Sequence, residues 1–286
     1  MKSVIISLVI LHALLLQGCA NQLFYYPSTA AHMNDDIRWL PSSSGNALAY
    51  LWLPSAVDTP KGIVVHFHGN SGHMEATQEK VNWLVEHGYH VLVFDYSGFG
   101  HSSGQPTDEA LYHDAMSMLA YSETLQDSMG LPVFVVATST GGNVFLRAWA
   151  DHPAEVAGII IDSSFTSYIE TAAFTLRQHV LGNMYAWVAS LVMRDDYAAD
   201  VAMANVPKTN ALVLHCEDDE VVPITAGEDL YAELEGDKTF WRLEGCRHAR
   251  AMTGAFPEVQ QRVVDWLAQS TPESNGVLGM NLAKRQ

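Results

Sequence analysis

The sequence is poor in cysteine and in positive charge. It has three cysteines in 286 residues, and none of them forms a Cys-x-x-Cys pair. So few cysteines exclude a disulfide-built scaffold, and the missing spacing gives no support for a zinc or iron–sulfur site. Lysine and arginine total 15 against 32 aspartate and glutamate residues, a net charge of −17. Binding to nucleic acid or anionic head groups is therefore not expected, because it needs clusters of lysine and arginine.

Internal repeats and low-complexity stretches are also missing. Hydrophobic residues make up 48 % of the chain, which excludes a largely disordered protein and is enough for a sizeable core. Because no linker-like stretch interrupts the chain, we expect one domain over residues 37–270. Residues 271–286 have no periodicity and are expected to form a flexible tail.

One hydrophobic run stands at the N-terminus. After Lys2 it extends from Val4 to Leu16, which is 13 residues and too short to span a bilayer, where about 20 are needed. Its length fits the apolar part of an export signal. A simple secretory signal and an uncleaved anchor are the alternatives.

The end of this run resembles a bacterial lipobox. It reads Leu16-Gln17-Gly18-Cys19, although Gln17 is not typical at its position. The resemblance implies a signal peptide over 1–18, lipidation of Cys19 and a lipidated N-terminal segment over 19–36. Ala20, rather than aspartate, follows the cysteine, which for such signals implies an outer-membrane location facing the periplasm.

Past this segment, strand-like and helix-like runs alternate. Several strands are apolar along their whole length, as strands covered on both faces must be. The alternation predicts an α/β fold with a mainly parallel central sheet and helices on both faces. The expected strands are 37–40, 47–53, 62–67, 90–95, 132–138, 157–162, 211–216 and 239–243. The expected helices are 74–87, 108–129, 141–151, 165–204, 225–235 and 258–268.

The candidate nucleophile is Ser139. The strand at 132–138 runs into Ala137-Thr138-Ser139-Thr140-Gly141-Gly142, and a helix follows. This is the pattern of a nucleophile elbow, with Ala137 where glycine is usual. Small residues are needed because the turn is tight and the neighbouring backbones come close together.

A serine hydroxyl needs a base, and the base needs a carboxylate that fixes its tautomer. Downstream of Ser139, an acidic turn containing Asp219 follows the strand at 211–216, and His248 follows the last strand. His248 is the only histidine after Asp219 and so has no rival as the base. Asp162, at the end of the strand at 157–162, is an alternative acid.

These segments together resemble the α/β-hydrolase superfamily, in its monoacylglycerol-lipase-like and serine-aminopeptidase-like branch. The resemblance covers roughly 37–268 and selects Asp219 over Asp218. It implies an oxyanion hole made by the backbone N–H groups of Thr140 and Asn70. The motifs that carry it are His68-Gly69-Asn70, Asp95 to Gly104, the elbow at Ser139, His215 to Pro223 with Cys216 for glycine, and Gly245-Cys246-Arg247-His248.

The same fold implies two further features. A short helical cap is expected over about 165–205, where apolar side chains could line an acyl pocket or simply pack two helices together. Cys216 stands at the end of one strand and Cys246 follows the next strand in the sequence, and in this fold those strand ends are neighbours. An oxidising compartment would allow a disulfide between them.

These observations favour a serine hydrolase that cleaves an ester or thioester with an apolar acyl part. It would need no cofactor, and the alternating His66 and His68 lack the pattern of a metal site. A peptidase or amidase with the same triad is the alternative enzyme. A catalytically silent envelope lipoprotein that acts as a binding module is the alternative outside catalysis. The sequence does not indicate an oligomeric state.

Overall fold

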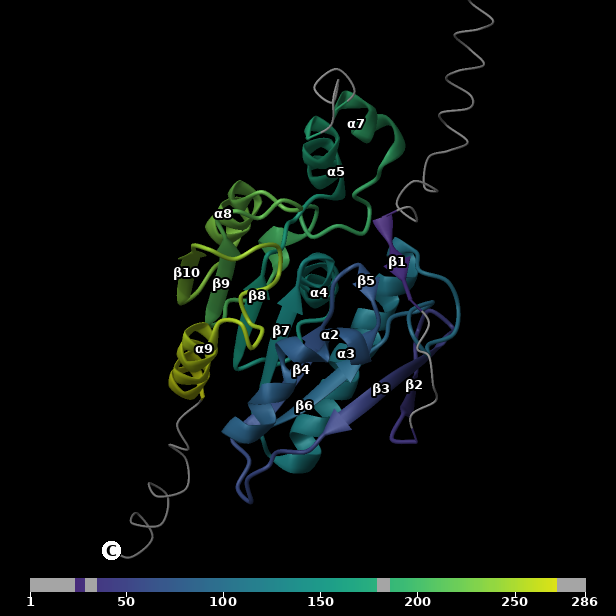
Figure 1. Ribbon diagram of the computed structural model, residues 1–286. Coiled ribbons are helices and arrows are strands. Elements are labelled where there is room, and N and C mark those ends of the chain that lie inside the picture. The colour runs from purple at the N-terminus through teal and green to yellow at the C-terminus, as the bar shows by residue number, and fades with distance from the viewer. Residues whose placement is uncertain (1–23, 29–34, 179–185, 272–286) are drawn as a thin grey trace, which may run out of the picture.

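The computed structural model describes residues 24–28, 35–178 and 186–271 (Figure 1). Its centre is an eight-stranded sheet in the order β10-β9-β8-β7-β4-β6-β3-β2. The strands from β10 to β6 are parallel, and β3 and β2 are antiparallel to their neighbours. The strands are β2 (Arg38–Pro41), β3 (Ala47–Leu53), β4 (Gly62–Phe67), β6 (Tyr89–Phe94), β7 (Val133–Thr138), β8 (Gly158–Asp162), β9 (Ala211–Cys216) and β10 (Lys238–Leu243).

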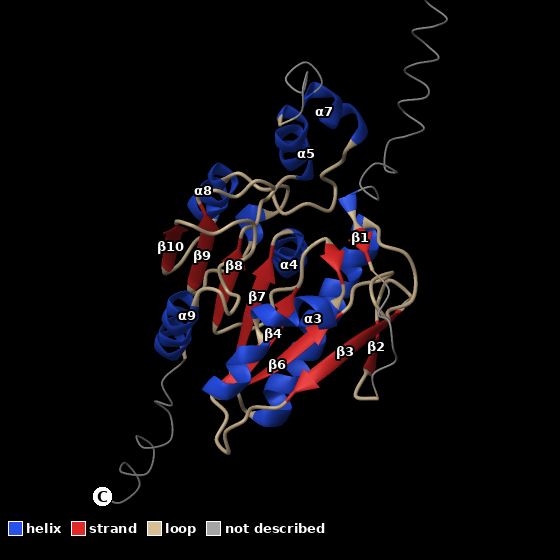
Figure 2. Ribbon diagram, in the orientation of Figure 1, coloured by secondary structure: helices blue, strands red, loops and turns tan. Residues whose placement is uncertain are grey.

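Helices cover both faces of this sheet (Figure 2). Helices α3 (Asp108–Met129), α4 (Thr140–Asp151) and α8 (Ile224–Glu233) contribute to one core cluster, and α2 (Met74–Thr77) and α9 (Pro257–Ser270) contribute to the other. Successive residues of β7 alternate between the two clusters, as the two-residue period of a strand requires. The prediction of a mainly parallel α/β sheet is confirmed.

The prediction of one continuous helix over 74–87 is wrong. The segment consists of α2 and two 3₁₀ turns, η2 (Gln78–Lys80) and η3 (Asn82–His87). Val81 breaks the helix between them with a φ of −135°, and its side chain is buried in the core. Burial of Val81 therefore outweighs regular helical geometry here.

The helix expected over 165–204 is also divided. It comprises α5 (Tyr168–Arg177), η4 (Ala186–Val188), α7 (Ala189–Val192) and η5 (Met203–Asn205). After α7 the chain turns back, and the Asp195 carboxylate accepts the Tyr168 N–H at 2.8 Å and the Ser167 hydroxyl at 2.7 Å. Asp195 thus caps the start of α5 from the far end of the cap. Residues 179–185 lie outside the described part of the cap.

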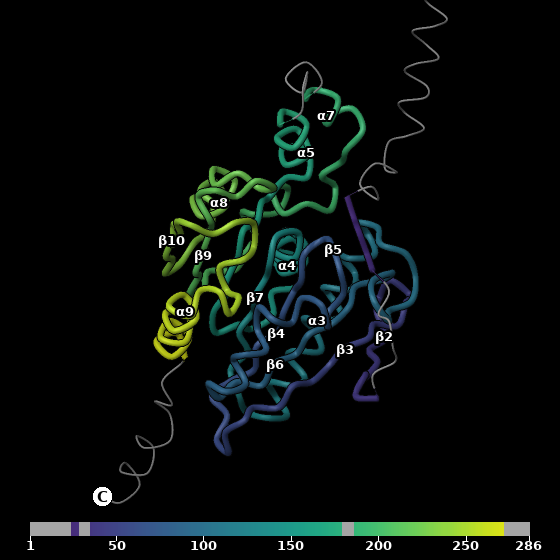
Figure 3. The backbone as a smooth tube through the Cα atoms, viewed as in Figure 1, coloured from purple at the N-terminus to yellow at the C-terminus, as the bar shows by residue number. Residues whose placement is uncertain are grey.

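A short strand near the N-terminus had no sequence signal. Residues Tyr26–Pro27 form β1, which pairs in parallel with β5 (Ser71–Gly72). Figure 1 shows β1 next to β5 and below α5 and α7, toward the end of the molecule where the parallel strands finish. The smooth tube in Figure 3 follows the same segment as it runs alongside the loop near β5.

The predicted signal peptide over 1–18 and Cys19, the predicted lipidation site, lie outside the described residues, as does nearly all of the predicted tail. Within the described ranges, no helix is long and apolar enough to cross a membrane.

Candidate active site

The site lies where the strand order reverses. The strand β4 lies between β6 and β7, so the connections that leave β4 and β7 go to opposite sides of the sheet. Such a reversal opens a crevice at the carboxyl ends of parallel strands. Asn70 follows β4 and Ser139 follows β7, so both residues stand at this crevice.

Ser139 forms a sharp turn between β7 and α4. Its φ of 54° and ψ of −123° are unusual for a residue with a side chain, and such backbone strain is typical of functional sites. Gly142 permits the turn, because a Cβ there would lie 2.3 Å from Ser164 Oγ. The Ser164 hydroxyl in turn donates to Ser139 O at 2.7 Å.

The structure brings Ser139, His248 and Asp219 together. Ser139 Oγ lies 3.0 Å from His248 Nε2. On the other side of the ring, His248 Nδ1 lies 2.8 Å from Asp219 Oδ2 and 3.0 Å from Oδ1. Because a carboxylate only accepts, Nδ1 carries a proton and Nε2 is free to accept the serine proton. This arrangement can move a proton from the hydroxyl to the imidazole.

Asp219 is held as a carboxylate by several donors. Its Oδ1 accepts the N–H groups of Val221 and Val222, each at 2.9 Å, and His215 Nε2 lies 3.4 Å from Oδ2. Burial alone would raise the pKa of Asp219, but hydrogen bonds from His215, His248 and Val222 outweigh it and hold the pKa well below its usual value. His215 was quoted in the sequence motif, but nothing in the motif indicated its contact with the acid.

Asp162, the alternative acid, does not bind the imidazole. Its side chain is fully buried, and neither carboxylate oxygen has a hydrogen-bond partner within the described residues. Burial raises its pKa, although Lys80 and His248 lower it in part. Its backbone carbonyl, however, accepts the Ser139 N–H at 2.8 Å. Asp162 therefore supports the nucleophile turn through its main chain.

Sequence patterns missed the residues that hold the base loop. Ser163 and Ala249 both have positive φ, 53° and 52°, and the Ala249 N–H donates to Ser163 Oγ at 3.1 Å. The Lys80 ammonium donates to Ala249 O from another side. A positive φ at a residue other than glycine changes neither the composition nor the periodicity of a sequence. No sequence signal could therefore have indicated Ser163 or Ala249.

Two backbone N–H groups next to Ser139 are the predicted oxyanion donors. Thr140 is the first residue of α4, where N–H groups have no partner inside the helix. Asn70 belongs to the loop that passes Ser139, since a Cβ on Gly69 would lie 3.4 Å from Ser139 Cβ. His68 Nδ1 donates to Gly69 O at 2.7 Å, which fixes the peptide plane that carries the Asn70 N–H. Burial lowers the pKa of His68, so the ring is neutral near pH 7.

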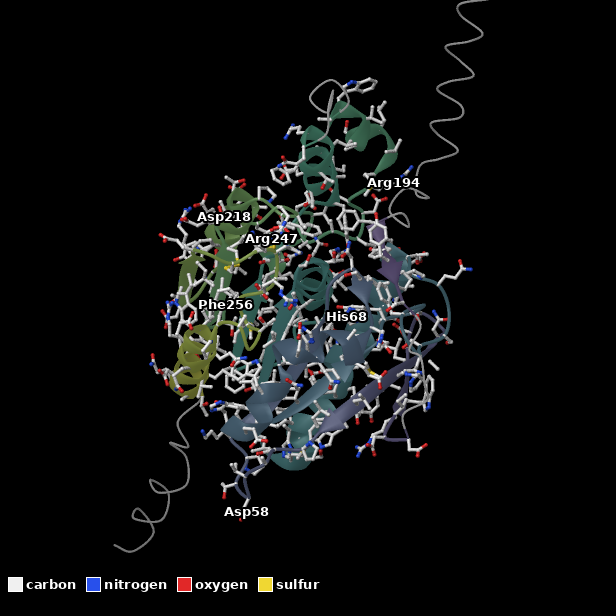
Figure 4. All side chains as sticks on the ribbon, in the orientation of Figure 1. Asp58, His68, Arg194, Asp218, Arg247 and Phe256 are labelled. Carbon is white, nitrogen blue, oxygen red and sulfur yellow. A yellow bond between two sulfur atoms is a disulfide. The ribbon has the colours of Figure 1, made fainter. Side chains whose placement is uncertain are left out.

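Cys216 and Cys246 form a disulfide, with their Cα atoms 5.4 Å apart. Cys216 ends β9 just before the Asp219 turn, and Cys246 follows β10 just before His248. Figure 4 labels Asp218 and Arg247, which stand in these two loops at the same end of the molecule. The disulfide therefore ties the loop of the acid to the loop of the base.

A cavity of about 590 Å³ lies between α5, η4 and the start of α8. Apolar side chains form part of its wall, together with Glu170, Asp229 and Arg177. Tyr168 and Met193 are instead buried in a small core cluster of the cap. Some apolar residues of the cap thus line a cavity, and others pack its helices together. The apolar lining residues include Phe165, Ile169, Ala173, Phe174, Trp187 and Ala226.

A metal site has no support in the described part of the chain, where no three histidine, cysteine or acidic residues could hold an ion. His66 Nε2 instead lies 3.3 Å from the Thr138 hydroxyl. Asp95 accepts the backbone N–H groups of Met74 and His101, so it anchors two turns.

Comparison with known proteins shows the family to which the chain belongs. The protein YfhR of Salmonella typhi, which is described as uncharacterized, is 30 % identical over 270 residues, covering 88 % of this chain and 89 % of that one. This chain belongs to the YfhR family of α/β-hydrolases. A family model described as "Serine aminopeptidase, S33" matches residues 58–195. The lysophosphatidylserine lipase ABHD12 of Gallus gallus is 27 % identical over 203 residues, covering 66 % of this chain and 52 % of that one.

Solved structures agree on the fold. An esterase from Pyrococcus furiosus has a TM-score of 0.66 at 17 % identity, with 87 % of this chain and 98 % of that one covered. A monoglyceride lipase from Saccharomyces cerevisiae has a TM-score of 0.66 at 16 % identity, with 86 % and 99 % covered. The expected α/β-hydrolase fold is confirmed.

Proposed function

We propose that the protein is a serine hydrolase that cleaves carboxylic esters or thioesters through an acyl-enzyme on Ser139. The observation that carries the proposal is the continuous hydrogen-bonded chain from Ser139 Oγ through His248 to Asp219. In this chain the nucleophile, the base and the orienting acid each have the partner that their role requires.

In the first half-reaction Ser139 Oγ attacks the carbonyl carbon while its proton passes to His248 Nε2. The C–O bond of the ester, or the C–S bond of a thioester, then breaks. The leaving oxygen or sulfur takes the proton from His248, and the acyl group stays on Ser139. Asp219 stabilises the imidazolium that exists between these two transfers.

In the second half-reaction a water molecule gives its proton to His248 and attacks the acyl carbon. The bond to Ser139 Oγ breaks, Oγ recovers the proton, and a carboxylic acid leaves. In both halves we assign the stabilisation of the negative charge on the carbonyl oxygen to the N–H groups of Thr140 and Asn70. Each such donor is typically worth about 3 kcal/mol of barrier.

An apolar acyl group is the substrate feature that the cap supports best. The cavity between α5, η4 and α8 has the size of a typical small-molecule site and several apolar walls, and it reaches Pro223 beside the Asp219 turn, although none of the triad residues lines it. Relatives named as lipases of lysophosphatidylserine and of monoglycerides support a substrate with one acyl chain. We therefore propose a single-chain lipid ester as the substrate class.

An amidase or aminopeptidase is the second candidate, and one observation favours it. The carboxylates of Glu170 and Asp229 line the cavity and could hold the positive amine of a substrate. The description of the matching family model points the same way. The cavity also holds Arg177, which offsets part of that negative charge.

We also propose that Cys19 is lipidated and anchors the protein at the outer membrane, facing the periplasm. The lipobox-like sequence before Cys19 supports an anchor. The disulfide between Cys216 and Cys246 supports an oxidising compartment.

The test is fluorophosphonate labelling of the wild type and of Ser139→Ala, followed by turnover of p-nitrophenyl esters of increasing chain length and of aminoacyl p-nitroanilides. We expect labelling of the wild type alone, with kcat/KM rising with acyl length. Equal labelling of both proteins would refute Ser139 as the nucleophile. Faster cleavage of the anilides would favour the aminopeptidase. No turnover of any substrate would favour a binding module.

A further inference from the structure

The strand β1 contacts the loop residue that carries an oxyanion donor. The Tyr26 N–H donates to Asn70 O at 2.7 Å, and Asn70 Nδ2 donates to Phe24 O at 2.7 Å. Two residues further along, the Ser28 N–H donates to Gly72 O at 3.0 Å. Asn70 is therefore bound to residues 24–28 through its main chain, to Tyr26, and through its side chain, to Phe24.

Tyr25 fixes this strand to the body of the enzyme. It is 5 % exposed, and its hydroxyl donates to Asp108 Oδ1 at 2.7 Å at the start of α3. The same hydroxyl lies 3.2 Å from the hydroxyl of Tyr168 on α5. The ring of Phe24 packs edge-on against Tyr168, with centroids 5.4 Å apart. The segment thus bridges the cap, α3 and the loop after β4.

These contacts determine the conformation of Asn70 from the side opposite to His68. His68 holds the Gly69 carbonyl, on the peptide before Asn70, and Tyr26 holds the Asn70 carbonyl, on the peptide after it. The two peptides that flank the Cα of Asn70 thus each have a carbonyl held by a hydrogen bond. Aim matters because an oxyanion donor works at 2.7–3.1 Å, and a misplacement of about 1 Å can cost 10²-fold in rate.

We infer that residues 24–28 are a positioning segment for the oxyanion hole, although they precede the hydrolase domain in the sequence. The inference rests on the proposed function, since it gives Asn70 N–H a task. Under it, loss of the contacts to β1 lowers kcat and leaves the binding of the acyl chain, and so KM, nearly unchanged.

Two variants break the two halves of the contact. Tyr26→Pro removes the N–H that binds Asn70 O. Asn70→Ala removes the side-chain amide that binds Phe24 O but keeps the Asn70 backbone N–H. If the oxyanion hole needed only this N–H and not its contacts with residues 24–28, Asn70→Ala would not lower kcat. We expect each variant to lower kcat by about 10- to 100-fold with KM changed by less than about threefold. Tyr26→Ala keeps the N–H and removes a ring that is 65 % exposed, so its kcat should stay near that of the wild type.

Ester turnover and the rate of fluorophosphonate labelling are measured at a temperature where circular dichroism shows all variants folded. If the wild type neither labels nor turns over, the proposed function fails. If the wild type is active and folded Asn70→Ala and Tyr26→Pro keep its kcat, the positioning role is refuted while the function stands. Should Tyr26→Pro not fold, Asn70→Ala decides alone.

Discussion

At the scale of single residues, the acid of the triad lies against two histidines. His248 binds Asp219 from the crevice side, and His215, which is fully buried, approaches the same carboxylate from within the fold. A charge surrounded by donors in this way stays ionised near pH 7, which is what a partner of an imidazolium needs.

Replacement of this acid should remove most of the activity. Asp219→Asn keeps the shape but offers an amide that can donate to His248 Nδ1, which favours the wrong tautomer. We expect kcat to fall by about 10³- to 10⁴-fold, as in other serine triads. The measurement is ester turnover of the purified variant.

The matched control is Asp162→Asn. Asp162 has no hydrogen bond to His248, and its raised pKa shows that burial disfavours its charge. The variant should keep most of the wild-type kcat. A comparable loss in both variants would mean that the two carboxylates share the role of the acid.

The members of the candidate triad could be predicted from the sequence by their chemical type and their order in the chain. Ser139, Asp219 and His248 were predicted because a nucleophile, an acid and a base leave motifs. Ser163, Ser164 and the contact of His215 with Asp219 could not be predicted, because they depend on which loops meet in space. A serine that supports a backbone carbonyl looks like any other serine in the sequence.

At the scale of elements, the disulfide joins the ends of β9 and β10. It closes a loop of 30 residues, for which the chain-entropy estimate gives about 3–4 kcal/mol of stabilisation. We expect the double variant Cys216→Ala/Cys246→Ala to lose this amount of unfolding free energy in urea. Its kcat/KM should also fall, because the loops of Asp219 and His248 are no longer tied together.

Dithiothreitol provides the internal control for this prediction. The reductant should lower the stability of the wild type toward that of the double variant and leave the double variant unchanged. A double variant as stable as the wild type would contradict the stabilising role of the bond.

The cap carries a prediction on chain length. Ala173→Trp places a large ring in the wall of the cavity, whereas Thr175→Trp changes an exposed residue of the same helix that does not line it. We expect Ala173→Trp to raise KM for the longest esters by about tenfold, equivalent to about 1.4 kcal/mol, and to leave the shortest unaffected. A uniform effect on all esters, or the same effect from Thr175→Trp, would show that the acyl chain lies elsewhere.

Elements were predictable from sequence where burial is regular. The buried central strands were found to within one or two residues, because both faces are apolar. The two predicted helices that proved discontinuous are interrupted in different ways. In the segment 74–87 the side chain of Val81 turns into the core, and in the segment 165–204 Asp195 folds back to cap the start of α5. Strand β1 has two residues, which is too short for any periodicity.

At the scale of the whole molecule, the attachment at Cys19 is a prediction that cell fractionation can test. Cys19→Ser in the full chain should lose incorporation of labelled palmitate and leave the outer-membrane fraction of a density gradient. Its kcat toward a short soluble ester should not change, because Cys19 precedes the segment that contacts Asn70. Retention of the variant in the outer membrane would contradict lipid anchoring.

Because Phe24 packs against the cap, the segment between Cys19 and Phe24 limits how far the cap can lie from Cys19. Five residue steps separate Phe24 from Cys19, and a fully extended chain covers at most about 18 Å over that distance. A lipid on Cys19 would therefore keep the catalytic crevice close to the bilayer surface. Substrate would arrive by lateral diffusion in two dimensions, so turnover would follow its mole fraction in the membrane rather than its bulk concentration.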